Sequence, residues 1–116
     1  MKDISTVEDI EKLVDKFYDK LMKDAATREK FEHLDLKVHL PKIVDFWAFI
    51  LLDKAGYVSN VFEKHKHLNL EPIHFEHWLS LWNQTVGELF EGQKADLANQ
   101  RAALLAFTFQ SKTKEN

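Results

Sequence analysis

Apolar residues recur at helical spacing along most of the chain. The clearest run lies near the N-terminus and comprises Val7, Ile10, Leu13, Val14, Phe17 and Leu21. Residues three or four positions apart share one face of an α-helix, so this run predicts an amphipathic helix over about residues 6–22. Ser5, with Glu8 three residues later, matches a capping box at its start. The chain has 3 glycines and 2 prolines among 116 residues, too few for the many turns of a β protein, so an all-α fold is predicted.

Four more helical segments are expected. A short helical turn is predicted at residues 28–31, and residues 36–40 lead into a long helix that reaches about residue 52, with Pro41 in its first turn. The next helix begins near Pro72, and Gly92 is expected to end it in the position that glycine usually takes after a helix. The last helix is predicted over about residues 94–110. Residues 55–69 carry little periodicity and predict a loop with at most one helical turn.

The length and charge of the chain restrict its function. A chain of 116 residues is the usual size of one domain, so a single domain over residues 1–116 is expected. The net charge is −3 and the lysines are spread out, which argues against nucleic acid and anionic membranes as partners. No cysteine is present for a disulfide or thiolate site, and no apolar stretch approaches the ~20 residues of a membrane span. A cytoplasmic protein is therefore expected.

A candidate iron ligand lies between two aromatic segments. His65 occurs in a polar stretch, residues 60–69, which follows an aromatic run from His39 to Trp47 and precedes another at residues 75–82. An imidazole can ligate haem iron, while phenol and indole groups donate hydrogen bonds. The pattern suits a haem held edge-on between helices, with His65 on one side and Tyr18 and a tryptophan on the other. The residues alone leave a second reading open, since a loop histidine is more often a plain surface residue.

The order and spacing of these segments resemble the truncated haemoglobins, and within them group III. The resemblance covers most of the chain and is carried by FYDKL at 17–21, Phe31, HLPKIVDFW at 39–47, NVFEKH at 60–65, FEHWLSLW at 75–82, ELF at 88–90 and QRA at 100–102. It implies an all-α fold, a two-over-two helical sandwich around haem b. It also implies His65 as the proximal iron ligand. A residue is missing between His65 and Pro72 relative to the family pattern, which leaves His67 open as the alternative ligand. On the distal side it implies Tyr18 and Trp78 as hydrogen-bond donors and His39 at the entrance.

Further side chains are expected to contact the haem. They are Phe31, Lys42, Ile43, Phe46, Trp47, Tyr57, Phe62, Leu79 and Trp82. Lys42 and Tyr57 are candidates for the haem propionates, and the others for apolar walls. Each has a plainer alternative, which is core packing for the apolar residues, a solvated lysine for Lys42 and a solvent-exposed helix end for His39. His74 and His77 lie three apart, but no further set of carboxylates and histidines completes a second metal site.

Two classes of function follow from a bound haem. The first is reversible binding of dioxygen, carbon monoxide, nitric oxide or similar small ligands, for storage, sensing or scavenging. The second is redox catalysis at the iron, as nitric oxide dioxygenation or peroxidase-like chemistry, which would need a reductase as partner. A third class, outside haem chemistry, is a helical protein-interaction module, whose purified protein would be colourless. We expect a ligand-binding haemoglobin rather than an enzyme, with redox catalysis as the alternative.

Overall fold

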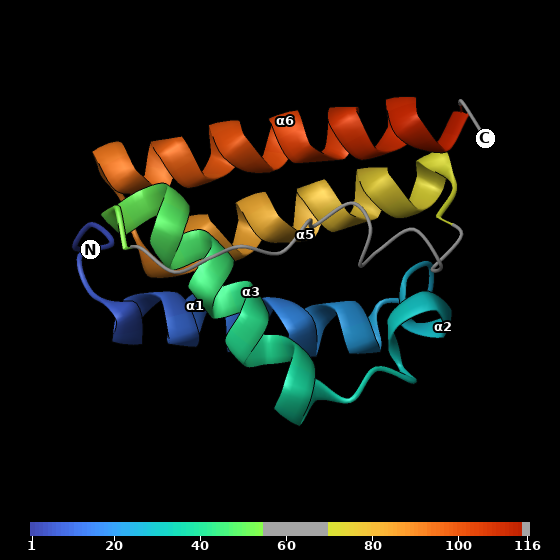
Figure 1. The fold of residues 1–116 in the computed structure, drawn as a ribbon, viewed down its shortest axis with the longest axis horizontal. Coiled ribbons are helices and arrows are strands. Elements are labelled where there is room, and N and C mark those ends of the chain that lie inside the picture. The colour runs from blue at the N-terminus through green and yellow to red at the C-terminus, as the bar shows by residue number, and fades with distance from the viewer. Residues whose placement is uncertain (55–69, 115–116) are drawn as a thin grey trace.

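All regular structure in the described part of the chain is helical, which confirms the predicted all-α class (Figure 1). The computed structural model describes residues 1–54 and 70–114. Its helices are α1 (Val7–Lys23), α2 (Arg28–Phe31), α3 (Leu36–Leu52), α5 (Pro72–Leu89) and α6 (Gln93–Lys114). Helices α5 and α6 pack side by side, and α1 packs against both α3 and α5. Two helices, α1 and α3, therefore lie over the pair α5 and α6.

The N-terminus of α1 is fixed by a capping box one residue later than predicted. The hydroxyl of Thr6 accepts the N–H of Asp9 at 3.1 Å, and the Asp9 carboxylate accepts the N–H of Thr6 at 3.1 Å. The predicted pair of Ser5 and Glu8 is therefore wrong. Asp9 is the carboxylate of the capping box because it is buried and also accepts the Ser5 N–H at 2.9 Å and the Lys2 ammonium at 2.8 Å.

Helix α3 begins earlier, relative to its proline, than the sequence pattern predicts. The Asp35 carboxylate accepts the N–H of Lys37 at 3.1 Å, so the helix begins at Leu36. Pro41 is consequently inside the helix rather than in its first turn, and that prediction is wrong. Proline has no N–H to donate to the carbonyl four residues earlier. The aspartate cap decides the helix start in spite of this lost hydrogen bond.

The connection between α5 and α6 also differs from the prediction. Helix α5 ends at Leu89, and Gly92 precedes the first residue of α6 instead of ending α5. Gly92 has φ +133°, and a Cβ atom there would lie 2.6 Å from Cγ of Asp3. The reason for this close approach is that Asp3 caps α6, its carboxylate accepting the N–H groups of Lys94 and Ala95, each at 2.9 Å.

The core lies where α1 and α3 meet the pair α5 and α6. Its largest fully buried side chains are Trp82 on α5 and Phe17 on α1. On α6 the fully or largely buried residues are Ala95, Ala98, Ala102 and Ala106. These small side chains let α5 approach α6 closely, and the Trp82 indole N–H donates to the Ala98 carbonyl at 3.2 Å. No helix in the described ranges is long and apolar enough to cross a membrane.

Candidate functional site

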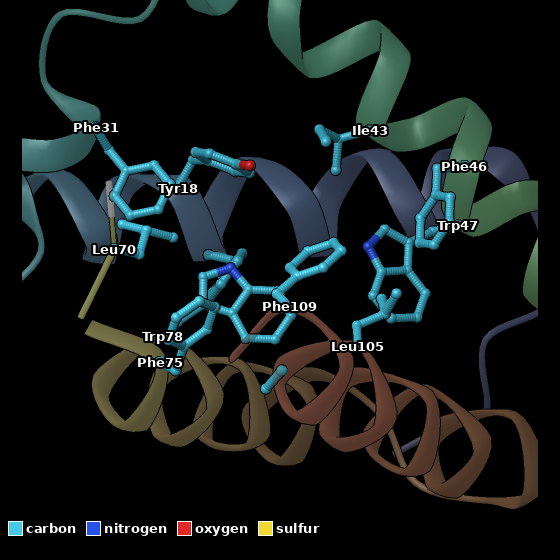
Figure 2. A pocket seen from close by; sticks show the side chains of 12 residues that line it. Tyr18, Phe31, Ile43, Phe46, Trp47, Leu70, Phe75, Trp78, Leu105 and Phe109 are labelled. Carbon is cyan, nitrogen blue, oxygen red and sulfur yellow. The ribbon is translucent and has the colours of Figure 1, made fainter. Parts of the chain in front are cut away.

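A cavity lies between the two helix pairs and is lined by twelve residues (Figure 2). Six of them are among the predicted site residues, namely Tyr18, Phe31, Ile43, Phe46, Trp47 and Trp78. Six others were not predicted, namely Phe17, Leu70, Phe75, Leu105, Ala106 and Phe109. Leu105 and Phe109 stand four apart on α6, a spacing that places them on one helix face and marks them as candidates. Tyr18 carries the one hydroxyl group among the twelve lining residues.

Tyr18 projects into the cavity from the buried face of α1. Its side chain is 3% exposed, and its ring packs edge-on against Phe17 and Phe31 at centroid distances of 5.5 and 6.2 Å. Burial raises the pKa of the Tyr18 phenol well above its usual range, because the charged phenolate is poorly solvated there. The hydroxyl therefore keeps its proton and remains a hydrogen-bond donor.

His39 meets Tyr18 at the edge of the cavity. Because α3 begins at Leu36, His39 lies in the first turn of that helix and faces α1. Its Nε2 atom and the Tyr18 hydroxyl share a hydrogen bond of 2.9 Å, and the two rings are nearly perpendicular at 5.3 Å. The imidazole itself is partly exposed and does not line the cavity. The structure thus brings together two of the three predicted distal residues.

Trp78 reaches the same cavity from α5 (Figure 2). Its ring packs edge-on against Phe17 at 5.6 Å and lies parallel to Trp82 at 6.3 Å. Among the residues that the structure describes, no group accepts a hydrogen bond from its indole N–H. Tyr18 and Trp78 therefore bring two polar donors to the cavity, and the indole of Trp47 brings a third N–H group, whereas the other lining side chains carry no N–H or O–H group.

The remaining predicted residues take other places. Trp82 is fully buried behind the cavity, stacked on Trp47 at 4.4 Å, and does not line it. Leu79 is partly buried against the core. Lys42 is exposed on α3 and does not line the cavity either. Tyr57, Phe62, His65 and His67 lie outside the described residues.

His74 and His77 are engaged with separate partners. Nδ1 of His74 accepts the N–H of Glu71 at 2.8 Å, at the start of α5. Nδ1 of His77 lies 3.1 Å from the carboxylate of Asp24, which follows α1. Burial raises the pKa of Asp24, but the hydrogen bonds from His77 and Thr27 outweigh it and lower the pKa overall. Within the described ranges, no three metal-ligating side chains come together.

The chemistry of the lining residues fits a haem group. A flat, largely apolar macrocycle requires apolar and aromatic walls on both faces, which α1, α3, α5 and α6 supply together. A small polar ligand held within such walls requires only a few donors, and Tyr18 and Trp78 are two. A site that takes one iron ligand from the protein needs no cluster of metal-binding side chains.

Comparison with known proteins agrees with this geometry. No protein-family model matches the chain. It is 32% identical over 113 residues to the group 3 truncated hemoglobin ctb of Campylobacter jejuni subsp. jejuni serotype O:2, covering 90% of this chain and 87% of that protein. A crystal structure of group III truncated hemoglobin from Campylobacter jejuni matches with a TM-score of 0.85 and 31% identity, covering 97% of this chain and 95% of the other.

The fold is therefore that of a truncated globin. At this identity and coverage, the chain belongs to the group III truncated haemoglobins.

Proposed function

We propose that this protein binds haem b in the cavity and, through it, dioxygen, carbon monoxide, nitric oxide or similar small ligands. When bound, the haem supplies an iron atom that coordinates a diatomic gas. The observation that carries the proposal is the buried Tyr18 hydroxyl, which keeps its proton inside walls of apolar and aromatic side chains. Membership of a haemoglobin family supports the same assignment.

Tyr18 is the principal donor to the ligand. When Nε2 of His39 carries the imidazole proton, it donates to the phenol oxygen across the 2.9 Å contact. The phenol O–H is then free to donate to a second acceptor, which is the ligand in the cavity. In the other tautomer Nε2 accepts the phenol proton, and Tyr18 has none to offer. The His39 tautomer therefore controls how Tyr18 is used.

Trp78 is the second donor. Its indole N–H has no acceptor in the described part of the chain, so a ligand in the cavity would provide one. The ring is held in place by edge-on packing against Phe17 at 5.6 Å. A donor held by packing loses little conformational entropy on binding, because its side chain is already ordered.

His65 is proposed as the proximal iron ligand, and His39 as a side chain at the distal entrance. Phe31, Ile43, Phe46 and Trp47 supply apolar walls from α2 and α3. Phe75 on α5 and Phe109 on α6 extend those walls from the other helix pair. The walls keep water away from the ligand, which strengthens each hydrogen bond made to it.

Absorption spectroscopy tests the proposal. The purified protein, supplied with haemin and freed of excess, is expected to show a Soret band and distinct ferric, ferrous, oxygenated and carbon monoxide spectra. Repeated cycles of oxygenation and deoxygenation without conversion of the oxygen would mark reversible binding. Sustained consumption of nitric oxide with nitrate formed, over many turnovers in the presence of a reductant that returns the iron to the ferrous state, would instead favour redox catalysis. Protein that stays colourless after haemin treatment would contradict the haem assignment itself.

A further inference from the structure

Three tryptophans form a stacked column beside the cavity. The rings of Trp47 on α3 and Trp82 on α5 lie 4.4 Å apart with an interplanar angle of 20°. Trp78, one turn earlier on α5, lies 6.3 Å from Trp82 at an angle of 8°. Trp47 and Trp78 line the cavity, whereas Trp82 is fully buried between them. The column thus touches the cavity at both ends and has its middle in the core.

We propose that this column accepts an oxidising equivalent from the haem-loaded cavity and shares it among the three indoles. The inference rests on the proposed haem binding. The oxidant is a hydroperoxide, which takes up two electrons and two protons as its O–O bond breaks, giving two molecules of water in the case of hydrogen peroxide. Bound haem would supply one of these electrons, and the indole of Trp78 or Trp47 would supply the other. An electron from Trp82 then refills that indole, so that the positive hole moves into the core.

The surroundings of Trp82 allow the hole to be held reversibly. Its N–H donates to the Ala98 carbonyl at 3.2 Å, and a neutral carbonyl is a very weak base. The oxidised indole therefore keeps its proton, and refilling requires only an electron from a small-molecule reductant such as ascorbate. Trp78 is partly buried rather than fully buried, so it is the member of the column best placed to receive that electron.

Tyr18 is the competing site for oxidation. A phenol loses its proton when it loses an electron, and Nε2 of His39 lies 2.9 Å away as a possible proton acceptor. The hole can thus rest on Tyr18 or on the column. The column competes with Tyr18 because its rings lie close enough for an electron to pass from one indole to the next, with centroids 4.4 and 6.3 Å apart.

Rapid-freeze electron paramagnetic resonance with hydrogen peroxide tests this inference. The ferric, haem-loaded protein is expected to give a tryptophan-type radical at high field. In Trp82→Phe the indole that links Trp47 to Trp78 is lost, so an electron can no longer pass between them through the core. The tryptophan-type signal should then decay severalfold faster, and a tyrosine-type signal should grow. Trp47→Phe removes one end of the column and should shorten the lifetime in the same direction, which provides a second variant if Trp82→Phe folds poorly.

Phe107 provides a matched control. Its ring lies on α6, is 67% exposed and does not line the cavity. Phe107→Leu removes an aromatic ring outside the column and should leave the radical type and lifetime as in the parent protein. A purely tyrosine-type radical in the parent protein, or an unchanged lifetime in both tryptophan variants, would overturn the inference. Failure to take up haem appears in the absorption spectrum before peroxide is added and would overturn the proposed function, together with this inference.

Discussion

The Tyr18 hydroxyl and Nε2 of His39, on α1 and α3, share a hydrogen bond of 2.9 Å. Tyr18 is 3% exposed, whereas His39 is partly exposed, so the bond joins the interior of the cavity to its edge. A change at either residue therefore alters the hydrogen bonding of the other. The first two predictions separate their contributions.

Replacing Tyr18 by phenylalanine removes the proposed principal donor to the ligand and keeps the ring. A hydrogen bond to a charged partner contributes about 1.5–3 kcal/mol, which corresponds to roughly a ten- to hundredfold faster release of oxygen from Tyr18→Phe. Trp78→Phe should change release in the same direction. Carbon monoxide is less polar when bound and should respond less, as measured by stopped-flow and flash photolysis. Equal acceleration for both gases would indicate that the residues act by blocking access.

Replacing His39 by alanine removes a side chain from the proposed distal entrance and leaves Tyr18. We expect His39→Ala mainly to raise the association rate of carbon monoxide and to leave its dissociation rate almost unchanged. Release of oxygen should not accelerate, because the Tyr18 hydroxyl can still donate to the ligand. If oxygen release became as fast as in Tyr18→Phe, His39 would be needed to orient the hydroxyl. A six-coordinate ferrous spectrum lost on mutation would instead make His39 an iron ligand.

Substitution of His65 and of His67 tests which of the two histidines is the proximal iron ligand. His65→Ala should yield protein with little bound haem, or with an altered spectrum that added imidazole restores. His67→Ala is the matched control, because it removes the same group two residues later, and it should keep the parent spectrum. Absorption spectra of both variants after haemin treatment provide the measurement. The reverse pattern would assign the iron to His67.

The contact between Asp3 and α6 should have a measurable effect on stability. Asp3→Ala removes the acceptor of three backbone N–H groups, two of them at the start of α6, and loss of a helix cap costs about 0.5–2 kcal/mol. Asp19→Ala is a suitable control, because Asp19 forms an exposed ion pair with Lys23, and such pairs contribute about 0–1 kcal/mol. Urea denaturation should place Asp3→Ala clearly below both the parent and the control. Similar midpoints for all three would show that the cap is not important.

Acid should destabilise the protein through Asp9. Burial alone would raise the pKa of Asp9, but the Lys2 ammonium and the N–H groups of Ser5 and Thr6 outweigh it and hold the pKa well below its usual range. The unfolded chain, with an aspartate pKa of about 3.9, therefore binds the proton first. The stabilisation is complete above about pH 5 and falls as the pH drops below about 4. Asp9→Asn should flatten the urea-measured profile, and a parallel profile would contradict this assignment.

Helical periodicity accounts for most of what could be predicted. The stripe that includes Phe17 placed Tyr18 on the correct helix, and the spacing of Phe75, Trp78 and Trp82 gave α5 its inner face. Periodicity does not say how deep a residue lies, so it left Trp82 open between core packing and contact with a cofactor; in the structure Trp82 is stacked on Trp47 and does not line the cavity. The hydrogen bond between Tyr18 and His39 depends on where α1 crosses α3. A local sequence pattern does not contain that information.

The errors at helix ends have a common physical origin. Thr6 with Asp9 and Ser5 with Glu8 satisfy the same capping pattern, and burial of the aspartate beside a lysine decides between them. Gly92 was read as the end of one helix, although its conformation serves a contact with Asp3, a residue far away in the sequence. Local patterns cannot rank alternatives that are decided by distant residues.

The contact between Asp3 and α6 also dictates an order of events during synthesis. Its partners Lys94 and Ala95 follow Asp3 by 91 and 92 residues. At about 5–20 residues per second, a ribosome needs roughly 5–20 s to add them. Throughout this interval Ile4, which is 1% exposed in the folded protein, lacks its final surroundings. The segment around Asp3 is therefore synthesised well before its partners and can take its final conformation only after the start of α6 has been added.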